Sequence, residues 1–168
     1  MPDHLSNGSV RRMRNERSAT PTPPNIRWNS SERPDFRDGA KALITDRNRV
    51  LLVKECHSDG STFWTLPGGG VKSGESFSAC LRRELREEIQ CRATVNKRLG
   101  QCVYRHMSRP VTTVYTVFDV TLRTEPESNT TEGVLDYAWL DPTELLSTTL
   151  SPVERFIDRS VTKTDEGE

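Results

Sequence analysis

A glycine-rich segment followed at once by an amphipathic stretch leaves this chain few ways to fold. Residues 63–66 are aromatic and β-favouring, and they end at Pro67, which predicts a short strand that stops there. Three glycines, residues 68–70, follow and predict a loop. Further on, apolar residues recur every four positions, at Phe77, Leu81, Leu85 and Ile89, which predicts a helix over 76–89. The middle of the chain is therefore expected to be a strand, a loop and a helix in direct succession.

The flanking sequence predicts a mixed α/β domain. Strand-like runs cover residues 40–45, 49–54, 99–105, 111–122 and 136–140, with a hairpin turn at 46–48 and a polar loop at 125–131. Asp141-Pro142 is expected to open a short terminal helix, because proline suits the first helical turn. Strands mixed with a central and a terminal helix indicate the α/β class.

Both ends of the chain are expected to lie outside that domain. Residues 1–36 hold five of the ten prolines and show no hydrophobic period, so we predict a disordered Arg/Pro/Ser-rich tail. Its arginine cluster, Arg11 to Arg17, is diluted by Glu16 and is interpreted as a solvated segment, with contact to RNA or another acidic partner as the alternative. The domain is expected at 37–160, with a flexible C-terminal tail at 161–168.

Composition excludes several classes of protein. The chain carries 24 Lys and Arg against 24 Asp and Glu, so no strong field is available for nucleic acid or for an anionic membrane. Its longest aliphatic run, 50–53, falls far short of the roughly 20 residues that span a bilayer. The four cysteines form no C-x-x-C pair, and no signal peptide is recognisable. We therefore expect reduced, mostly buried thiols and a cytoplasmic location.

Three glutamates of the predicted helix point to chemistry. Glu84, Glu87 and Glu88 share an arc of about 100° on the helix surface. Carboxylates packed this closely repel one another, and a hard cation with oxygen ligands, Mg²⁺ or Mn²⁺, relieves that repulsion. The alternative is a solvated face in which Arg83 pairs with Glu87 at i, i+4.

The glycine segment favours the first interpretation. Glycines allow the backbone to approach a ligand closely, and the free N–H groups of a helix start favour phosphate. An ordinary tight turn would also explain the glycines alone. Next to a carboxylate-rich helix, however, the loop can hold phosphate oxygens close to a metal. Neither a Walker loop nor a dinucleotide-binding fingerprint is present.

The pattern Gly69-x5-Glu75-x7-Arg83-Glu84-Leu85-Arg86-Glu87-Glu88 resembles the Nudix box, which here spans Gly69 to Cys91. This box is the signature of hydrolases acting on nucleoside diphosphates linked to another moiety. Gln90 stands where the family usually has glycine, a residue that suits a left-handed helix C-cap. The resemblance implies an α/β/α sandwich around a mixed sheet, and it is compatible with a homodimer.

The resemblance also implies roles for individual residues. Metal ligands are expected at Glu84, Glu87 and Glu88, with the carbonyl of Gly68 as a further candidate. Glu87 or Glu88 is expected to orient or deprotonate the attacking water, and Arg83 to hold a carboxylate in place. Loop and substrate positions are expected at Gly69, Gly70 and Glu75, the last bracing the loop through an arginine. A further catalytic carboxylate is expected at Glu132, with Asp136 as second choice.

The implied function is Mg²⁺-dependent cleavage of a phosphoanhydride bond in a small nucleotide, such as ADP-ribose or a nucleotide sugar. Two alternatives stay open: removal of nucleoside triphosphates, and a nucleotide-sensing module without catalysis. Candidate base-stacking aromatics are Phe63, Trp64, Tyr104, Tyr115 and Tyr137, each of which also suits the core.

Overall fold

The computed structural model describes residues 35–106 and 110–165 of the chain. The predicted tail lies outside the described residues except at its end, because Asp35 and Phe36 already belong to the first strand. At the other end helical backbone continues to Asp165. Regular structure therefore extends beyond the expected range 37–160 on both sides.

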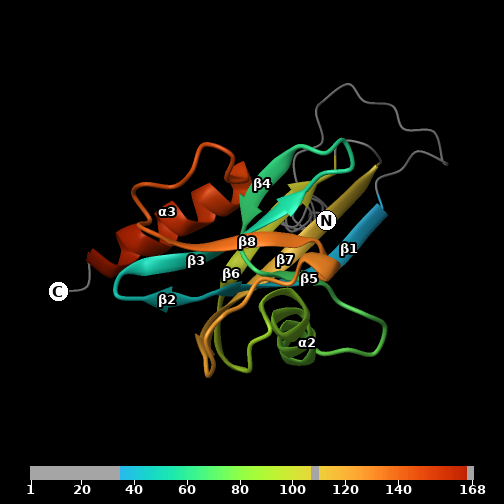
Figure 1. Cartoon of the computed structure of the whole chain (residues 1–168), viewed down its shortest axis with the longest axis horizontal. Helices are drawn as coiled ribbons and strands as arrows, with labels where there is room; N and C mark the ends of the chain where they lie inside the picture. Colours follow the sequence, from blue (N-terminus) through green and yellow to red (C-terminus); the bar gives the residue numbers. More distant parts are fainter. Residues whose placement is uncertain (1–34, 107–109, 166–168) are drawn as a thin grey trace, which may run out of the picture. The chain divides into compact units, whose positions relative to one another are not determined.

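The strands form two sheets (Figure 1). In the first, β1 (Asp35–Leu43) runs parallel to β7 (Val111–Leu122) and antiparallel to the short β5 (Gly68–Gly70). The outer strand β6 (Ala93–Arg105) pairs antiparallel with β7 and bulges between Val95 and Gly100. The sheet is therefore mixed, as the sequence predicts.

The second sheet is antiparallel. Its central strand β3 (Arg49–Cys56) pairs with β2 (Thr45–Asp46), β4 (Thr62–Thr65) and β8 (Val134–Leu140). The predicted hairpin is confirmed: Asp46 pairs with Arg49, and the turn residues Arg47 and Asn48 have φ of 49° and 62°. Two left-handed residues are typical of a type I′ turn, which matches the twist of the strands it joins.

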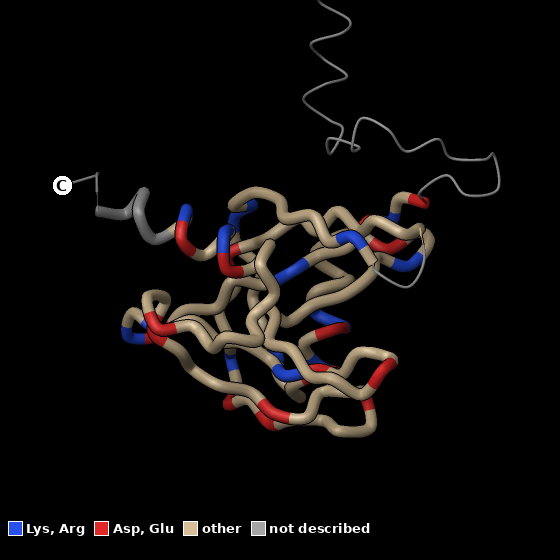
Figure 2. Tube along the Cα trace, turned by 90° about the horizontal axis from the view of Figure 1, so that it is seen from above, with Lys and Arg blue, Asp and Glu red and all other residues tan. Residues whose placement is uncertain are grey.

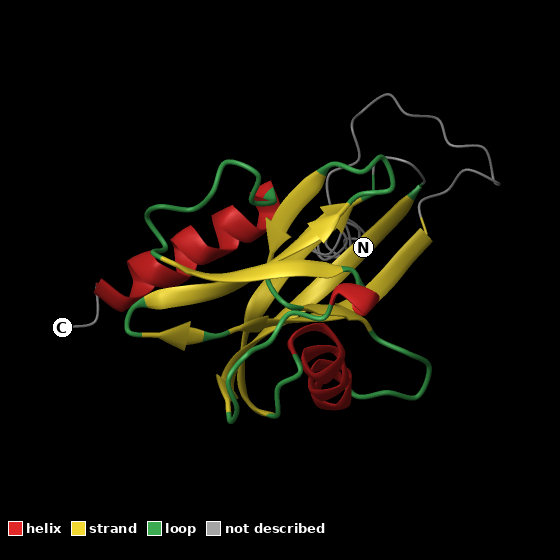
Figure 3. Ribbon diagram, in the orientation of Figure 1, coloured by secondary structure: helices red, strands yellow, loops and turns green. Residues whose placement is uncertain are grey.

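Two α-helices flank the strands, α2 (Phe77–Ile89) and α3 (Ser151–Asp165) (Figure 3). Alternate residues of β1 enter different hydrophobic clusters. Ala40 and Ala42 pack in the cluster that contains the buried face of α2, whereas Leu43 packs with Ile157 of α3. Since successive side chains of a strand point to opposite faces, the two helices cover opposite faces of β1. This arrangement is the expected α/β/α sandwich.

The central helix forms as its sequence predicts. Ser76 caps its start by accepting a hydrogen bond from the Ala79 N–H at 3.1 Å. Leu81, Leu85 and Ile89 are fully buried, while Phe77 is only partly buried. At the other end Gln90 adopts the left-handed conformation, with φ 55° and ψ 33°, so it keeps the backbone that glycine usually provides.

Two local predictions are wrong. Asp141-Pro142 opens no helix, because the Asp141 carboxylate accepts from the N–H and the hydroxyl of Thr143 and holds a turn instead. The terminal helix starts at Ser151 and carries Pro152 in its first turn. The glycine triplet is a strand, β5, rather than a loop, and it pairs with 39–41 of β1.

Surface and thiol chemistry agree with the composition. Acidic and basic residues are mixed along much of the described chain (Figure 2), but residues 124–154 carry seven acidic residues and no Lys or Arg. Cys80, Cys91 and Cys102 are buried free thiols, whereas Cys56 is exposed. Among the described helices, none is long and apolar enough to cross a membrane.

Candidate active site

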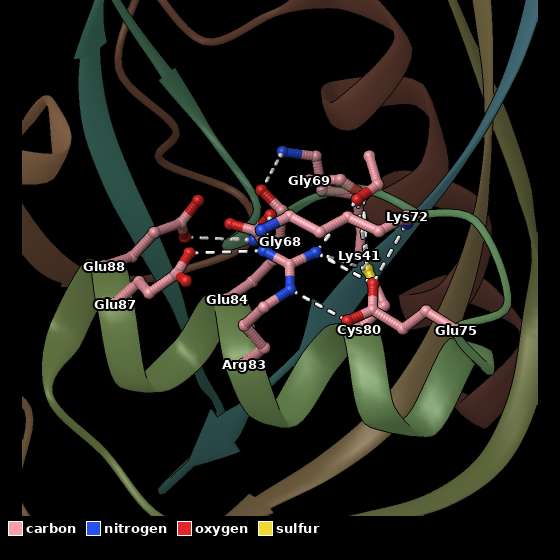
Figure 4. Close-up of polar contacts among 11 residues, drawn as sticks. Lys41, Gly68, Gly69, Lys72, Glu75, Cys80, Arg83, Glu84, Glu87 and Glu88 are labelled. Carbon is pink, nitrogen blue, oxygen red and sulfur yellow. Dashed lines mark hydrogen bonds and ion pairs between the residues drawn. The ribbon is translucent and has the colours of Figure 1, made fainter.

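The site forms where the glycines of β5 lie against α2 (Figure 4). The Gly68 N–H donates to Glu88 Oε2 at 3.1 Å. A β-carbon built on Gly69 would lie 2.5 Å from Glu84 Oε1, closer than real contacts allow, so any larger residue there would force the Glu84 side chain to move. Gly68 has φ 135°, and a β-carbon there would collide with the carbonyl of Ala40. The glycines therefore bring backbone and helix carboxylates into direct contact.

Arg83 joins the carboxylates of this helix to the loop that precedes it. Its guanidinium donates to both oxygens of Glu75, at 2.8 and 2.9 Å, and to the carbonyl of Gly70 at 3.1 Å. The remaining nitrogen donates to Glu84 Oε1 at 2.8 Å and to Glu87 Oε2 at 3.2 Å. The structure thus brings Arg83 and Glu75 together in the way that the resemblance implies.

These bonds shift the acidity of both partners. Hydrogen bonds from Arg83 and from the Lys72 N–H lower the pKa of Glu75 to about 2. The hydrogen bond to Glu75 and the charge of Glu84 raise the pKa of Arg83, despite opposition from burial. Both groups are therefore charged throughout the ordinary pH range and hold each other in a fixed geometry.

Glu88 differs from the other two helix carboxylates. Its side chain is buried, with 5% of the residue exposed, and it faces the β5 backbone. Burial raises its pKa well above the ordinary value, the charge of Lys41 opposes that rise, and the charges of Glu55 and Glu84 add to it. The carboxylates of such a cluster repel one another, and a bound cation would remove this repulsion.

The sequence analysis did not identify two charged residues that lie beside Glu88. They are Lys41 and Glu55. Lys41 is 5% exposed, and its ammonium donates to the Gly68 carbonyl at 3.2 Å and lies 4.8 Å from the centre of the Tyr115 ring. Burial disfavours its charge, but Tyr115, Glu55 and Glu88 outweigh burial and raise the pKa of Lys41. The available signal was a lone lysine inside the otherwise apolar run 40–44. Glu55 sits in a strand with no comparable signal.

The donor chemistry of the site fits a hard divalent cation. Glu84, Glu87 and Glu88 offer carboxylate oxygens on one side of α2, the ligand type that Mg²⁺ and Mn²⁺ prefer. Within the described residues, however, no three acidic, histidine or cysteine side chains converge closely enough to hold a metal as they stand. Arg83 instead bridges Glu84 Oε1 and Glu87 Oε2, so a cation would compete with the guanidinium for these two oxygens.

The two candidates for a further carboxylate lie in different settings. Glu132 is exposed in a 3-10 helix, η1 (Thr130–Glu132), which follows a loop docked on the C-terminal turn of α2. Asn129 makes that docking, donating from its side chain to the Glu87 carbonyl at 2.7 Å and from its N–H to the Glu88 carbonyl at 3.1 Å. Asp136 is exposed on β8, and its carboxylate accepts from the Tyr137 N–H. Neither carboxylate contacts the helix trio in a described hydrogen bond or ion pair.

A cleft of about 680 Å³ opens beside the loop that Glu75 ends. Its walls come from the start of β1, from residues 70–75 and from the β6–β7 side of the first sheet. They are lined by Arg37, Asp38, Gly70, Val71, Lys72, Ser73, Gly74, Glu75, His106, Thr113 and Tyr115. The volume is that of a small-molecule site, and Tyr115 and the charged residues suit a nucleotide.

Comparisons with known proteins point in one direction. The sequence model of the NUDIX domain matches residues 35–161. A nucleoside triphosphatase, NudI of Escherichia coli, is 32% identical over 126 residues, which cover 67% of this chain and 87% of the relative. The crystal structure of a MutT protein from Methanosarcina mazei superposes with a TM-score of 0.69 at 20% identity, covering 78% of this chain and 96% of that one. An ADP-ribose pyrophosphatase from Streptococcus suis gives 0.54 at 20% identity, covering 74% and 91%. At such identities the solved structures show a shared fold.

Proposed function

Because this chain belongs to the Nudix hydrolase family, we propose that it cleaves a phosphoanhydride bond of a nucleotide by attack of water at phosphorus, with a divalent cation. The observation that carries this proposal is the contact between the β5 glycines and the carboxylates of α2. That contact brings carboxylate oxygens against close backbone, and Gly70 at the end of β5 also lines a cleft of about 680 Å³.

In this proposal the helix carboxylates Glu84, Glu87 and Glu88 hold Mg²⁺ or Mn²⁺. The bound cation neutralises phosphate charge and makes water a stronger nucleophile at neutral pH. Glu87 or Glu88 orients the attacking water and accepts its proton. Glu132, on the η1 turn that docks against α2, is the candidate to supply a further carboxylate from outside the helix.

Arg83 and Glu75 act as positioning residues. Their paired hydrogen bonds tie the 70–75 loop to the middle of α2, so the glycine backbone and the carboxylates keep one relative position. Positioning of this kind supplies much of the rate in phosphoryl transfer, because the reacting groups are held in line before reaction.

Two classes of nucleotide are candidate substrates. The family signature favours a nucleoside diphosphate linked to another moiety. The 32% identity to a relative described as a nucleoside triphosphatase favours nucleoside triphosphates instead. In either case we propose that the base or sugar occupies the cleft beside Tyr115 while the phosphates face α2. A sensing module without catalysis is disfavoured, because it has no need of three carboxylates on one helix face.

The test is Mg²⁺-dependent hydrolysis of a panel that contains nucleoside triphosphates, ADP-ribose, nucleotide sugars and dinucleoside polyphosphates. Glu87→Gln protein runs in parallel to identify contaminating activity. Turnover of one class by the wild type, absent from the variant, supports the proposal and names the substrate. No turnover of any class with either Mg²⁺ or Mn²⁺ would refute it.

A further inference from the structure

Lys41 is a buried charge whose place in the fold is unusual. It lies near the C-terminal end of β1, in register with Gly68 of β5, and only 5% of the residue is exposed. Lysine is almost never this deeply buried unless a partner compensates for the lost hydration. The partners of Lys41 are groups of the candidate active site.

The two backbone polar groups of Gly68, which belong to successive peptide groups, are each bound by a charged side chain. Its N–H donates to Glu88 Oε2 at 3.1 Å, and its carbonyl accepts from the Lys41 ammonium at 3.2 Å (Figure 4). Within the described residues the Gly68 carbonyl is the one hydrogen-bond acceptor of Lys41. The ring of Tyr115 lies below the ammonium at 4.8 Å, so an aromatic face supplies further attraction.

This arrangement places a cation where a metal ion is expected. The resemblance makes the Gly68 carbonyl a candidate metal ligand beside Glu88. A divalent ion bound there would lie next to the ammonium, in a buried setting that screens the repulsion poorly. The ammonium belongs to a residue that is only 5% exposed and lies 4.8 Å from the centre of the Tyr115 ring, so it has little exposure to the solvent that would screen a neighbouring charge.

We propose that Lys41 is a built-in cation that replaces a metal ion at the Gly68 carbonyl. The divalent cations of this chain are then held by the carboxylates of α2 without that carbonyl. Lys41 also fixes the orientation of the peptide group between Gly68 and Gly69, and it acts as a positioning residue for β5. The inference rests on the proposed metal-dependent function, but it concerns how many ions bind rather than whether they bind.

The experiment counts Mn²⁺ ions bound to the full chain without nucleotide, by electron paramagnetic resonance of free Mn²⁺ in equilibrium with protein. Lys41→Met removes the charge at similar length and is expected to bind one more Mn²⁺ per chain than the wild type. Lys41→Arg keeps the charge and is expected to bind the wild-type number. Lys97→Met removes an exposed lysine of β6 and serves as the matched control, with no change expected.

An equal or smaller number of ions in Lys41→Met, with the control unchanged, overturns the inference while the proposed function stands. If none of the proteins binds Mn²⁺, both the inference and the proposed function fail. Should Lys41→Met not fold, anomalous diffraction from Mn²⁺-soaked wild-type crystals decides the question. Ions at the helix carboxylates with none bonded to the Gly68 carbonyl support the inference, and an ion bonded to that carbonyl overturns it.

Discussion

At the scale of single residues, the site depends on charges that compensate one another at short range. Arg83 holds three carboxylates of the loop and helix, and Lys41 and Glu88 bind the carbonyl and the N–H of Gly68, respectively. Bonds between charged groups are stronger and more directional than those between neutral groups. Removing one charged partner therefore leaves the remaining charges uncompensated and repelling one another. The role of each of these residues can be tested by mutation.

The Glu75–Arg83 pair makes a prediction about pH. The fold lowers the pKa of Glu75 from the ordinary 4.5 to about 2, so it stabilises the ionised form. The stabilisation is complete above pH 4.5 and is lost as the pH falls from there to about 2. We expect Glu75→Gln to be less stable than the wild type at pH 7, with the difference shrinking through that window. Urea melts at a series of pH values measure it, and a difference independent of pH would contradict the assignment.

At the scale of elements, the contact between β5 and α2 places the proposed catalytic groups. Gly69 is in contact with the Glu84 carboxylate, whereas a β-carbon on the neighbouring Gly70 would meet nothing within 4 Å. We expect Gly69→Ala to push Glu84 aside and to lower kcat/KM by about 10²-fold, since small displacements have effects of this size.

Gly70→Ala is the comparison variant: it adds the same atom at a residue that also lines the cleft, but the atom meets no protein atom within 4 Å and leaves Glu84 in place. Steady-state kinetics of both variants, with melting curves to verify folding, provide the measurement. Equal activities for the two variants would show that the approach of β5 to Glu84 does not position the site.

The C-terminus of α2 gives a prediction about stability. Gln90 occupies the left-handed conformation that glycine adopts with little strain. We expect Gln90→Gly to raise the free energy of unfolding by about 0.5–1 kcal/mol, the relief of strain being partly offset by greater freedom of the unfolded chain. Gln90→Ala keeps the strain and also removes the side-chain bond to the Ser128 carbonyl, so it should give no gain. Denaturant melts that rank alanine equal to or above glycine would contradict this account.

At the scale of the whole molecule, local pattern predicts elements well and pairing poorly. The four-residue apolar spacing predicted α2, and the β-branched runs predicted β3 and β7. The parallel pairing of β1 with β7 joins segments far apart in sequence, so no local signal reveals it. The pairing of β5 with β1 also joins distant segments, so no local signal reveals it. The three glycines alone favoured a loop. For α3, the Asp-Pro signal at 141 was misleading because the carboxylate bonded locally to Thr143.

The candidate site shows the same division. The Nudix box pattern identified Glu75, Arg83 and the helix glutamates from the sequence. These residues lie within 14 positions of one another and share one helix and the loop before it, so their spacing is visible in the sequence. Lys41, Glu55 and Asn129 reach the site through β1, β3 and the loop before η1. Their contribution depends on tertiary structure, so sequence reasoning could not place them.

The central claim is that the carboxylates of α2 carry out metal-dependent hydrolysis, and Glu88→Gln tests it most directly. Glutamine keeps the size of the buried side chain and an oxygen that accepts the Gly68 N–H, so the fold should persist. On the substrate that the panel identifies, we expect the Mg²⁺-dependent kcat to fall by about 10²- to 10⁴-fold, as for loss of a general base. Glu154→Gln, on the exposed side of α3, should retain full activity. Near wild-type turnover by folded Glu88→Gln protein would contradict the account.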